Sequence, residues 1–148
     1  ERGGGRPTPA INIHLTLQYL GEVPVEPRDT LTSLARQLST ERFTLNFRRH
    51  EVWCRGNLLV CTAALPSALN ELVHGLRSLV TTTGLSTESR PYRPHLTIAR
   101  KVAQSTPLPT LAPQLRWAPL TFALCRSRLE LTGARYSVLE EFPLGGNT

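Results

Sequence analysis

Two short stretches of the sequence place a histidine two positions before a threonine. Residues 14–17 read HLTL, inside "INIHLTLQYL", and residues 95–98 read HLTI, inside "RPYRPHLTIAR". Side chains two positions apart on a strand point to the same face, so each stretch would present an imidazole beside a hydroxyl. One such pair is typical of an ordinary polar surface. Two of them in a chain with four histidines indicate a shared site.

Two imidazoles and two hydroxyls suit attack on phosphorus. A neutral histidine can take a proton from the nucleophile while a protonated one gives a proton to the leaving oxygen, which predicts His14 and His95 as acid and base. The hydroxyls of Thr16 and Thr97 can donate to the non-bridging phosphate oxygens. A zinc site needs a third and usually a fourth ligand at close spacing, which neither stretch offers, so no metal is predicted.

The charge of the chain favours an anionic partner. Seventeen Lys and Arg against eleven Asp and Glu give a net charge of +6, which suits RNA, a nucleotide or acidic lipid, although a merely basic surface fits equally well. Three widely spaced cysteines indicate neither a disulfide framework nor a zinc site, so we expect a reducing, cytoplasmic location. No apolar run approaches the roughly 20 residues of a membrane span.

The 148 residues are enough for one domain, 1–148, with its own core. Alternating apolar residues predict strands, and a period near 3.6 predicts helices. The expected strands are 11–19, 43–47, 57–65, 95–98, 120–131 and 134–142, and the expected helices run from Leu31 to Leu38 and from Ser67 to Gly84. Interleaved helices and short neighbouring strands predict the α+β class with mainly antiparallel sheet.

The two motifs and their surroundings resemble a known family. The HLTL and HLTI pair is similar to the H-x-[ST]-x signature of the two-histidine phosphoesterase superfamily, which occurs once per lobe. "HLTLQYLGEV" (14–23), "RPYRPHLTIAR" (90–100) and "GARYSVLEEFPL" (133–144) resemble the bacterial RNA 2′,3′-cyclic phosphodiesterases, first described as 2′-5′ RNA ligases. The resemblance covers nearly the whole chain. It implies a bilobal fold with two mainly antiparallel sheets, flanking helices and an active site in a central groove.

The same resemblance implies roles for six residues. By position they are an acid, a base, two phosphate-binding hydroxyls, a phosphate-binding arginine and a base-stacking aromatic: His14, His95, Thr16, Thr97, Arg100 and Tyr92. In that scheme His14 protonates the departing 3′ oxygen and His95 activates water.

The N-terminus departs from the family pattern. Family members place a strand and a helix before the loop that leads to the first motif, whereas "ERGGGRPTPA" (1–10) resembles only that loop. The chain also contains no Met. We therefore expect the natural protein to extend upstream of Glu1 by a strand and a helix that this chain lacks.

Other histidines, tryptophans and arginines have less specific patterns. His50 and His74 lack a threonine two positions on and are expected at the surface. Trp53 and Trp117 are expected to pack in the core or between lobes. Five arginines could form an RNA-facing patch: Arg48, Arg49, Arg55, Arg126 and Arg128.

The predicted function is hydrolysis of RNA 2′,3′-cyclic phosphate ends to 2′-phosphomonoesters. The expected partner is RNA or a nucleotide, with no cofactor, membrane or protein partner, so we expect a monomer. Two alternatives stay open: joining of RNA ends through a 2′-5′ bond by the reverse transesterification, and a non-catalytic RNA-binding module that uses Tyr92. Turnover of a cyclic-phosphate oligonucleotide separates the enzyme from the binding module.

Overall fold

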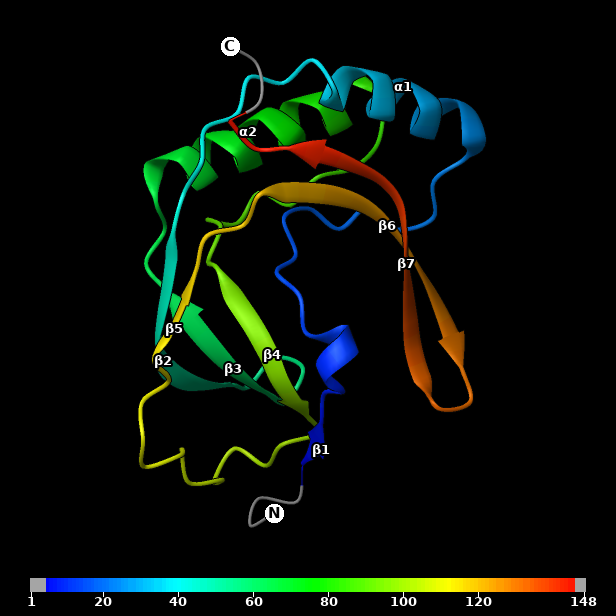
Figure 1. Ribbon diagram of the computed structural model, residues 1–148. Helices are drawn as coiled ribbons and strands as arrows, with labels where there is room; N and C mark the ends of the chain where they lie inside the picture. Colours follow the sequence, from blue (N-terminus) through cyan, green and yellow to red (C-terminus); the bar gives the residue numbers. More distant parts are fainter. Residues whose placement is uncertain (1–4, 146–148) are drawn as a thin grey trace. The chain divides into compact units, whose positions relative to one another are not determined.

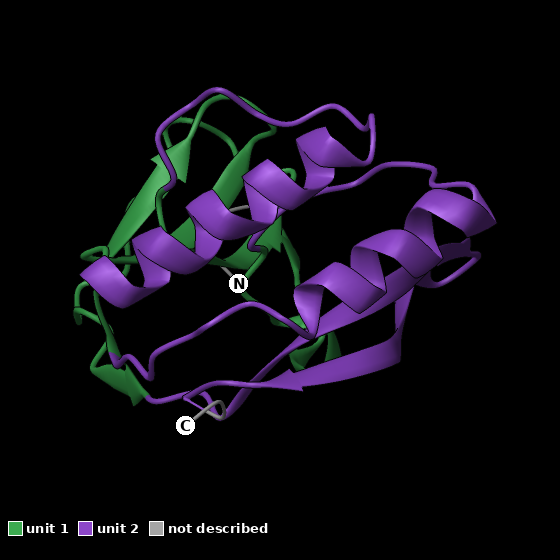
Figure 2. Ribbon diagram, turned by 90° about the horizontal axis from the view of Figure 1, so that it is seen from above, with its two compact units in different colours: residues 1–16, 45–65, 93–117 green, residues 17–44, 66–92, 118–148 purple. Residues whose placement is uncertain are grey.

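The computed structural model describes residues 5–145 of the chain. These residues form two compact units, each assembled from three separate stretches of chain (Figure 2). Unit 1 contains the chain up to Thr16 together with residues 45–65 and 93–117. Unit 2 contains residues 17–44, 66–92 and the chain from Ala118 onwards.

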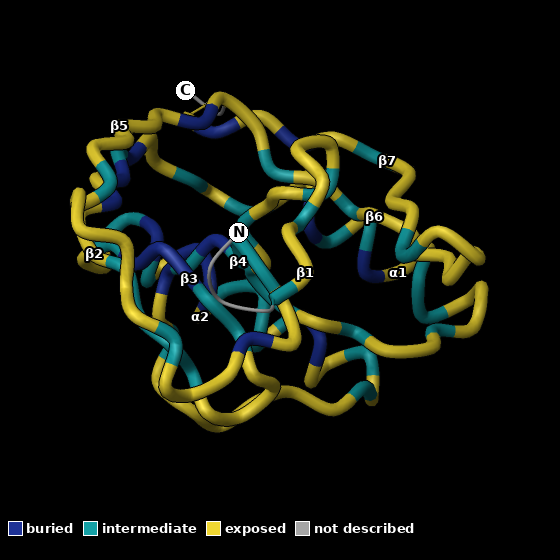
Figure 3. The backbone as a smooth tube through the Cα atoms, turned by 90° about the horizontal axis from the view of Figure 1, so that it is seen from below, coloured by how far each residue is buried: buried dark blue, intermediate teal, exposed yellow. Residues whose placement is uncertain are grey.

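Unit 1 is built on a five-stranded antiparallel sheet with the strand order β1-β4-β3-β2-β5 (Figure 1). The strands are β1 (Arg6–Pro7), β2 (Leu45–Trp53), β3 (Leu58–Ala63), β4 (His95–Arg100) and β5 (Leu115–Trp117). β3 lies at the centre, and Val60, Cys61 and Thr62 along it are buried (Figure 3). The strand predicted over 57–65 is confirmed for Leu58–Ala63, whereas Asn57 belongs to the preceding turn and Leu65 is exposed. Gly56 and Asn57 adopt positive φ in the turn between β2 and β3, which glycine and asparagine tolerate best.

Unit 2 contains the helices α1 (Val25–Ala35) and α2 (Ser67–Thr82) and a hairpin of β6 (Thr121–Glu130) and β7 (Gly133–Pro143). α2 buries one stripe of apolar side chains, namely Leu69, Leu72, Val73 and Val80. It ends at Thr82, and Gly84 just beyond it has positive φ, which allows the backbone N–H of Leu85 to donate to the carbonyl of Val80. Phe122 and Phe142 stack across the hairpin with ring centroids 4.9 Å apart. Residues 125–132, which include the end of β6 and the turn of the hairpin, are exposed.

We expect Leu69→Ala to lower the free energy of unfolding by about 2 to 5 kcal/mol, because the side chain is fully buried at 0% exposure and its removal leaves a cavity. Urea titration followed by circular dichroism measures this loss. Glu71→Ala on the exposed face of the same helix is the control and should change stability by less than about 0.5 kcal/mol. Equal losses in both variants would contradict the assignment of Leu69 to the core.

The α+β class is confirmed, but several predicted elements differ from the structure. The strand expected over 43–47 runs from Leu45 to Trp53. The expected strand 11–19 is wrong: a 3-10 helix, η1 (Ala10–Asn12), is followed by irregular backbone. A strand needs a neighbour for its backbone hydrogen bonds, and among the described residues none is paired with 13–20 in a sheet. Ile11 and Tyr19, the first and last of the alternating apolar residues from which this strand is predicted, are 91% and 72% exposed.

The first helix begins earlier than expected, at Val25 instead of Leu31. Its first turns carry Glu26, Arg28 and Asp29, so they lack the apolar stripe from which the helix is predicted. Pro27 is tolerated there because the first turn leaves its N–H groups without an intrahelical acceptor. The short strand β5 was not expected, since three residues show no periodicity.

Candidate active site

Strand β4 presents the second motif on one face of the unit 1 sheet. Its register pairs His95 with Thr62 and Thr97 with Val60. Directly opposed residues in an antiparallel pair share a face, so His95 and Thr97 lie on the same side of the sheet. Leu96, between them, points to the other side and is buried.

An irregularity in β4 follows the second motif. Thr97 pairs with Val60 on β3, whereas Ala99 pairs with Leu59, the next residue along. Two residues advance on β4 for one on β3, so Ile98 is the extra residue of a β-bulge. The bulge reverses the alternation of side chains beyond it.

This reversal determines the position of Arg100. In a regular strand, a residue five positions after His95 would lie on the opposite face. With the bulge between them, the register places Arg100 on the same face as His95 and Thr97. The predicted phosphate-binding arginine and the second motif are therefore brought to one side of the sheet.

Strand β1 adds a second arginine at this position. Arg6 is paired with Arg100, and the backbone N–H of Thr8 donates to the carbonyl of Ile98 at 2.8 Å. Opposed residues share a face, so the side chains of Arg6 and Arg100 emerge on the same side of the sheet. Because the pairing is antiparallel, β1 leads the chain from the Arg100 end of β4 towards the His95 end.

The first motif lies in the irregular segment after η1. His14 and Thr16 are both exposed, and both belong to unit 1 together with β4. The resemblance implied one motif in each lobe, whereas the division into compact units places both histidines in unit 1. Leu17, directly after Thr16, is the first residue of unit 2.

The two histidines have the same local hydrogen bond. Nδ1 of His14 lies 2.7 Å from the carbonyl oxygen of Asn12, and Nδ1 of His95 lies 2.9 Å from that of Arg93. A carbonyl oxygen only accepts, so Nδ1–H is the donor in both rings. The neutral form of each imidazole therefore carries its proton on Nδ1. Acid–base chemistry is thereby assigned to Nε2 in both residues.

A cluster that the sequence did not reveal surrounds His95. The rings of Trp53 and His95 lie 4.4 Å apart between centroids, with an interplanar angle of 51°. The carboxylate of Glu51 accepts hydrogen bonds from Trp53 Nε1 at 2.8 Å, Arg93 at 2.9 Å and Thr62 at 3.2 Å. Trp53 was expected in the core or between lobes, but it is half-buried and packs against a candidate catalytic residue. Only the two-residue spacing of Glu51 and Trp53 on β2 could have indicated a shared face.

These contacts act on the charge of Glu51. The hydrogen bond from Trp53, and then the Arg93 guanidinium, lower the pKa of Glu51 from its ordinary value of 4.5, against the opposing effect of partial burial. The folded state therefore favours the ionised carboxylate. The resulting stabilisation is modest because Glu51 is partly exposed. It is fully present above pH 4.5 and is lost as the pH falls through the lower pKa of the folded state.

We accordingly expect the stability difference between the wild type and Glu51→Gln to shrink on acidification. Urea titrations at pH values from about 7 to about 3 measure it. The neutral side chain of the variant cannot titrate, so only the wild type loses this contribution at low pH. A difference that stays constant over this range would contradict the lowered pKa.

The remaining predicted residues are divided between the two units. Tyr92 belongs to unit 2, where burial raises the pKa of its hydroxyl and nearby Arg77 opposes that rise. Its base-stacking role stays a prediction. His74 is exposed as expected. His50, on β2, is half-buried and is paired with Cys61 on β3. The five arginines are all exposed, three in unit 1 and two in unit 2.

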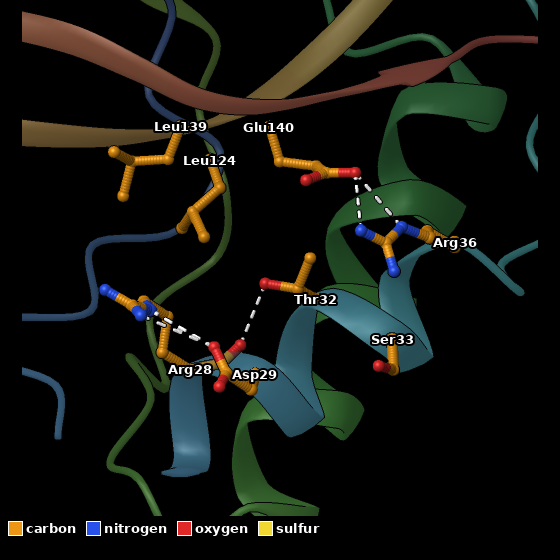
Figure 4. Close-up of a pocket in the computed structure, with 8 residues that line it drawn as sticks. All are labelled: Arg28, Asp29, Thr32, Ser33, Arg36, Leu124, Leu139 and Glu140. Atoms are coloured by element: carbon orange, nitrogen blue, oxygen red, sulfur yellow. Dashed lines mark hydrogen bonds and ion pairs between the residues drawn. The ribbon is translucent and has the colours of Figure 1, made fainter. Parts of the chain in front are cut away.

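Unit 2 contains a cavity of about 390 Å³ beside α1 (Figure 4). Arg36 is hydrogen-bonded to Glu140 at 2.7 Å, and Arg28 contacts Asp29 at 3.4 Å. Two positive and two negative charges therefore compensate one another, which is a poor setting for a phosphate. Within residues 5–145, no group of three or more His, Cys, Asp or Glu side chains could hold a metal ion. None of the described helices is long and apolar enough to span a bilayer.

Comparison with known proteins identifies the family. The model of the 2′-5′ RNA ligase superfamily matches residues 2–132. An RNA 2′,3′-cyclic phosphodiesterase of Escherichia coli is 31% identical over 141 residues, which cover 95% of this chain and 80% of the relative. One of Thermus thermophilus is 32% identical over 159 aligned residues, covering 97% and 77%. The crystal structure of E. coli LigT complexed with 3′-AMP matches with a TM-score of 0.86 at 30% identity, covering 97% of this chain and 83% of that one. This chain belongs to the 2′-5′ RNA ligase superfamily.

Proposed function

We propose that this protein hydrolyses RNA 2′,3′-cyclic phosphate ends to 2′-phosphomonoesters, with His14 and His95 as acid and base. The observation that carries the proposal is that Nδ1 of each histidine is hydrogen-bonded to a backbone carbonyl, which assigns the proton-transferring role to Nε2 in both rings. Two relatives with about one third identity have the name RNA 2′,3′-cyclic phosphodiesterase, which supports this reaction. We expect the protein to act as a monomer in the cytoplasm.

The reaction needs one proton removed and one supplied. Water attacks phosphorus and gives a proton to Nε2 of His95, the bond from phosphorus to the 3′ oxygen breaks, and Nε2 of His14 protonates that oxygen. The product carries its phosphate on the 2′ oxygen and a free 3′ hydroxyl. Entering and leaving oxygens lie on opposite sides of phosphorus in an in-line displacement, so one imidazole cannot serve both.

Three further side chains stabilise the developing negative charge in this proposal. The hydroxyls of Thr16 and Thr97 donate to the non-bridging phosphate oxygens, and Arg100 supplies charge and a pair of N–H donors. Support for Arg100 comes from the bulge in β4, which returns it to the face of His95 and Thr97. Such donors act most strongly where charge grows between the ground state and the transition state.

The family description favours joining of RNA ends as a second reaction of the same site. Here a 5′ hydroxyl replaces water as the nucleophile, and the bond that forms is a 2′-5′ phosphodiester. The proton transfers are otherwise unchanged, so the same two histidines would serve. The relative amounts of water attack and hydroxyl attack then depend on how an acceptor RNA is bound.

An oligonucleotide with a 2′,3′-cyclic phosphate end tests both reactions. Mass spectrometry should show the gain of one water, and phosphorus NMR should place the product phosphate on the 2′ oxygen. A second oligonucleotide with a 5′ hydroxyl, added in excess, reports joining as a longer product. Chelator should leave the rate unchanged. Binding of the oligonucleotide without any product would contradict the enzymatic assignment and favour an RNA-binding module.

A further inference from the structure

Three residues outside the two motifs are placed beside His95 by the unit 1 sheet. Val60 on β3 pairs with Glu51 on one side and with Thr97 on the other. Glu51 therefore shares a face with the second motif, and Trp53, two positions on, shares it too. Arg93 lies two residues before His95, at the entry to β4.

These residues form a closed ring of contacts. Trp53 packs against the imidazole of His95 and donates its indole N–H to Glu51. Glu51 accepts from the Arg93 guanidinium with both carboxylate oxygens, at 2.9 Å each. The backbone carbonyl of Arg93 in turn accepts from Nδ1 of His95. The Arg93 guanidinium carbon also lies 5.1 Å from the centre of the Trp53 ring, within range of a cation–π contact.

The ring of contacts restrains the imidazole in two independent ways. The hydrogen bond to the Arg93 carbonyl holds one atom, Nδ1, but permits the imidazole to tilt about that atom. The indole of Trp53 limits this tilt by packing against the ring. Together the two contacts set the direction in which Nε2 points. A displacement of about 1 Å of a reacting group can cost on the order of 10²-fold in rate, so this direction matters for proton transfer.

Orientation is a better account of this cluster than stability. The Glu51–Arg93 pair is partly exposed, with 30% and 58% of the two side chains accessible to solvent. Ion pairs exposed to this extent contribute little to the free energy of unfolding. The same pair nevertheless holds an aromatic side chain and the carbonyl that binds Nδ1, so its removal should disturb the imidazole first.

We propose that Glu51, Trp53 and Arg93 form a positioning clamp that fixes the tautomer and the ring plane of His95. The clamp rests on the proposed function only in treating His95 as catalytic. None of the three residues takes or gives a proton in the reaction. They act through His95.

Kinetic measurements test the clamp through variants that remove one contact at a time. Trp53→Leu removes the aromatic contact and the indole N–H, and should lower kcat by about 10- to 100-fold with KM unchanged. Trp53→Phe retains a ring against His95 and should recover most of that loss. Glu51→Ala should resemble Trp53→Leu, whereas Glu51→Gln retains an acceptor for the indole N–H and should be milder. A rise in KM with kcat unchanged would instead assign Trp53 to substrate binding and overturn the clamp.

The tautomer of His95 can be observed without substrate. Proton–nitrogen correlation spectra of the imidazole rings, assigned with His95→Asn, should show the Nδ1–H form for the neutral ring of the wild type. Trp53→Leu and Glu51→Ala should show a mixture of the two tautomers. This separates the two hypotheses: an inactive wild type with the expected spectra contradicts the proposed function, and unchanged spectra in both variants contradict the clamp.

Matched controls lie in the same chain. Glu140→Gln removes the carboxylate of a comparable ion pair, with Arg36 at 2.7 Å in unit 2, and Trp117→Phe shortens the other tryptophan. Both should leave kcat and the His95 spectrum unchanged. Thermal unfolding of every variant verifies the fold. Normal kcat in a folded Trp53→Leu protein, or an equal loss in Glu140→Gln, would overturn the proposal.

Discussion

His14→Ala and His95→Ala are each expected to lower the rate of cyclic-phosphate hydrolysis by about 10²- to 10⁴-fold, the usual contribution of one acid or base. In each histidine Nδ1 is hydrogen-bonded to a backbone carbonyl, so Nε2 is the nitrogen that transfers the proton. Each change to alanine removes this nitrogen and with it one of the two proton transfers. Single-turnover kinetics with a cyclic-phosphate oligonucleotide measures the loss directly.

The double variant tests whether the two histidines act as a unit. Its loss should be far smaller than the product of the two single losses, because either change alone already prevents the concerted transfer. The wild-type rate should pass through a maximum with pH, since one imidazole must be neutral while the other is protonated. His74→Ala, at an exposed position of α2, is the control and should behave as the wild type. Near-normal hydrolysis by His14→Ala would contradict the two-histidine mechanism.

Arg100→Ala is expected to lower kcat on every cyclic-phosphate substrate by about 10²- to 10³-fold, the range seen when one donor to a developing oxyanion is lost. The expectation depends on the bulge at Ile98, which brings Arg100 to the face of His95. Arg100→Lys keeps the charge but not the planar pair of donors, so it should restore only part of the rate. Arg116→Ala, an exposed arginine on β5, is the matched control.

Comparison with Tyr92→Ala separates phosphate binding from base binding. A stacked base contributes roughly 1 to 3 kcal/mol on an aromatic side chain, so this change should mainly raise KM, most for purine ends. Arg100→Ala should lower kcat irrespective of the base. Small and equal effects of the two changes would contradict the placement of the phosphate beside β4.

The late strands, the second helix and the family could all be predicted from the sequence, because each depends on local patterns. Alternation over 120–131 and 134–142 corresponds to β6 and β7, and the apolar stripe from Ser67 corresponds to α2. The doubled motif led to the resemblance that the family match confirms. The prediction of a strand over 11–19 is wrong because alternation describes only the two faces of a segment. A strand also needs a neighbouring strand for its backbone hydrogen bonds.

The sequence by itself determined the chemical groups of the candidate site: two imidazoles, two hydroxyls and an arginine at recognisable spacings. Only the tertiary structure decided the side of the sheet to which they point and which side chains hold them. The bulge at Ile98 arises from the pairing of β4 with β3, so a five-residue spacing alone assigns Arg100 to the wrong face. Glu51 and Trp53 lie about forty positions from His95 in the chain, and no local pattern records contacts between strands that are distant in sequence. Their position beside the imidazole results from the register of three neighbouring strands, which is set by backbone hydrogen bonds and burial across the whole sheet.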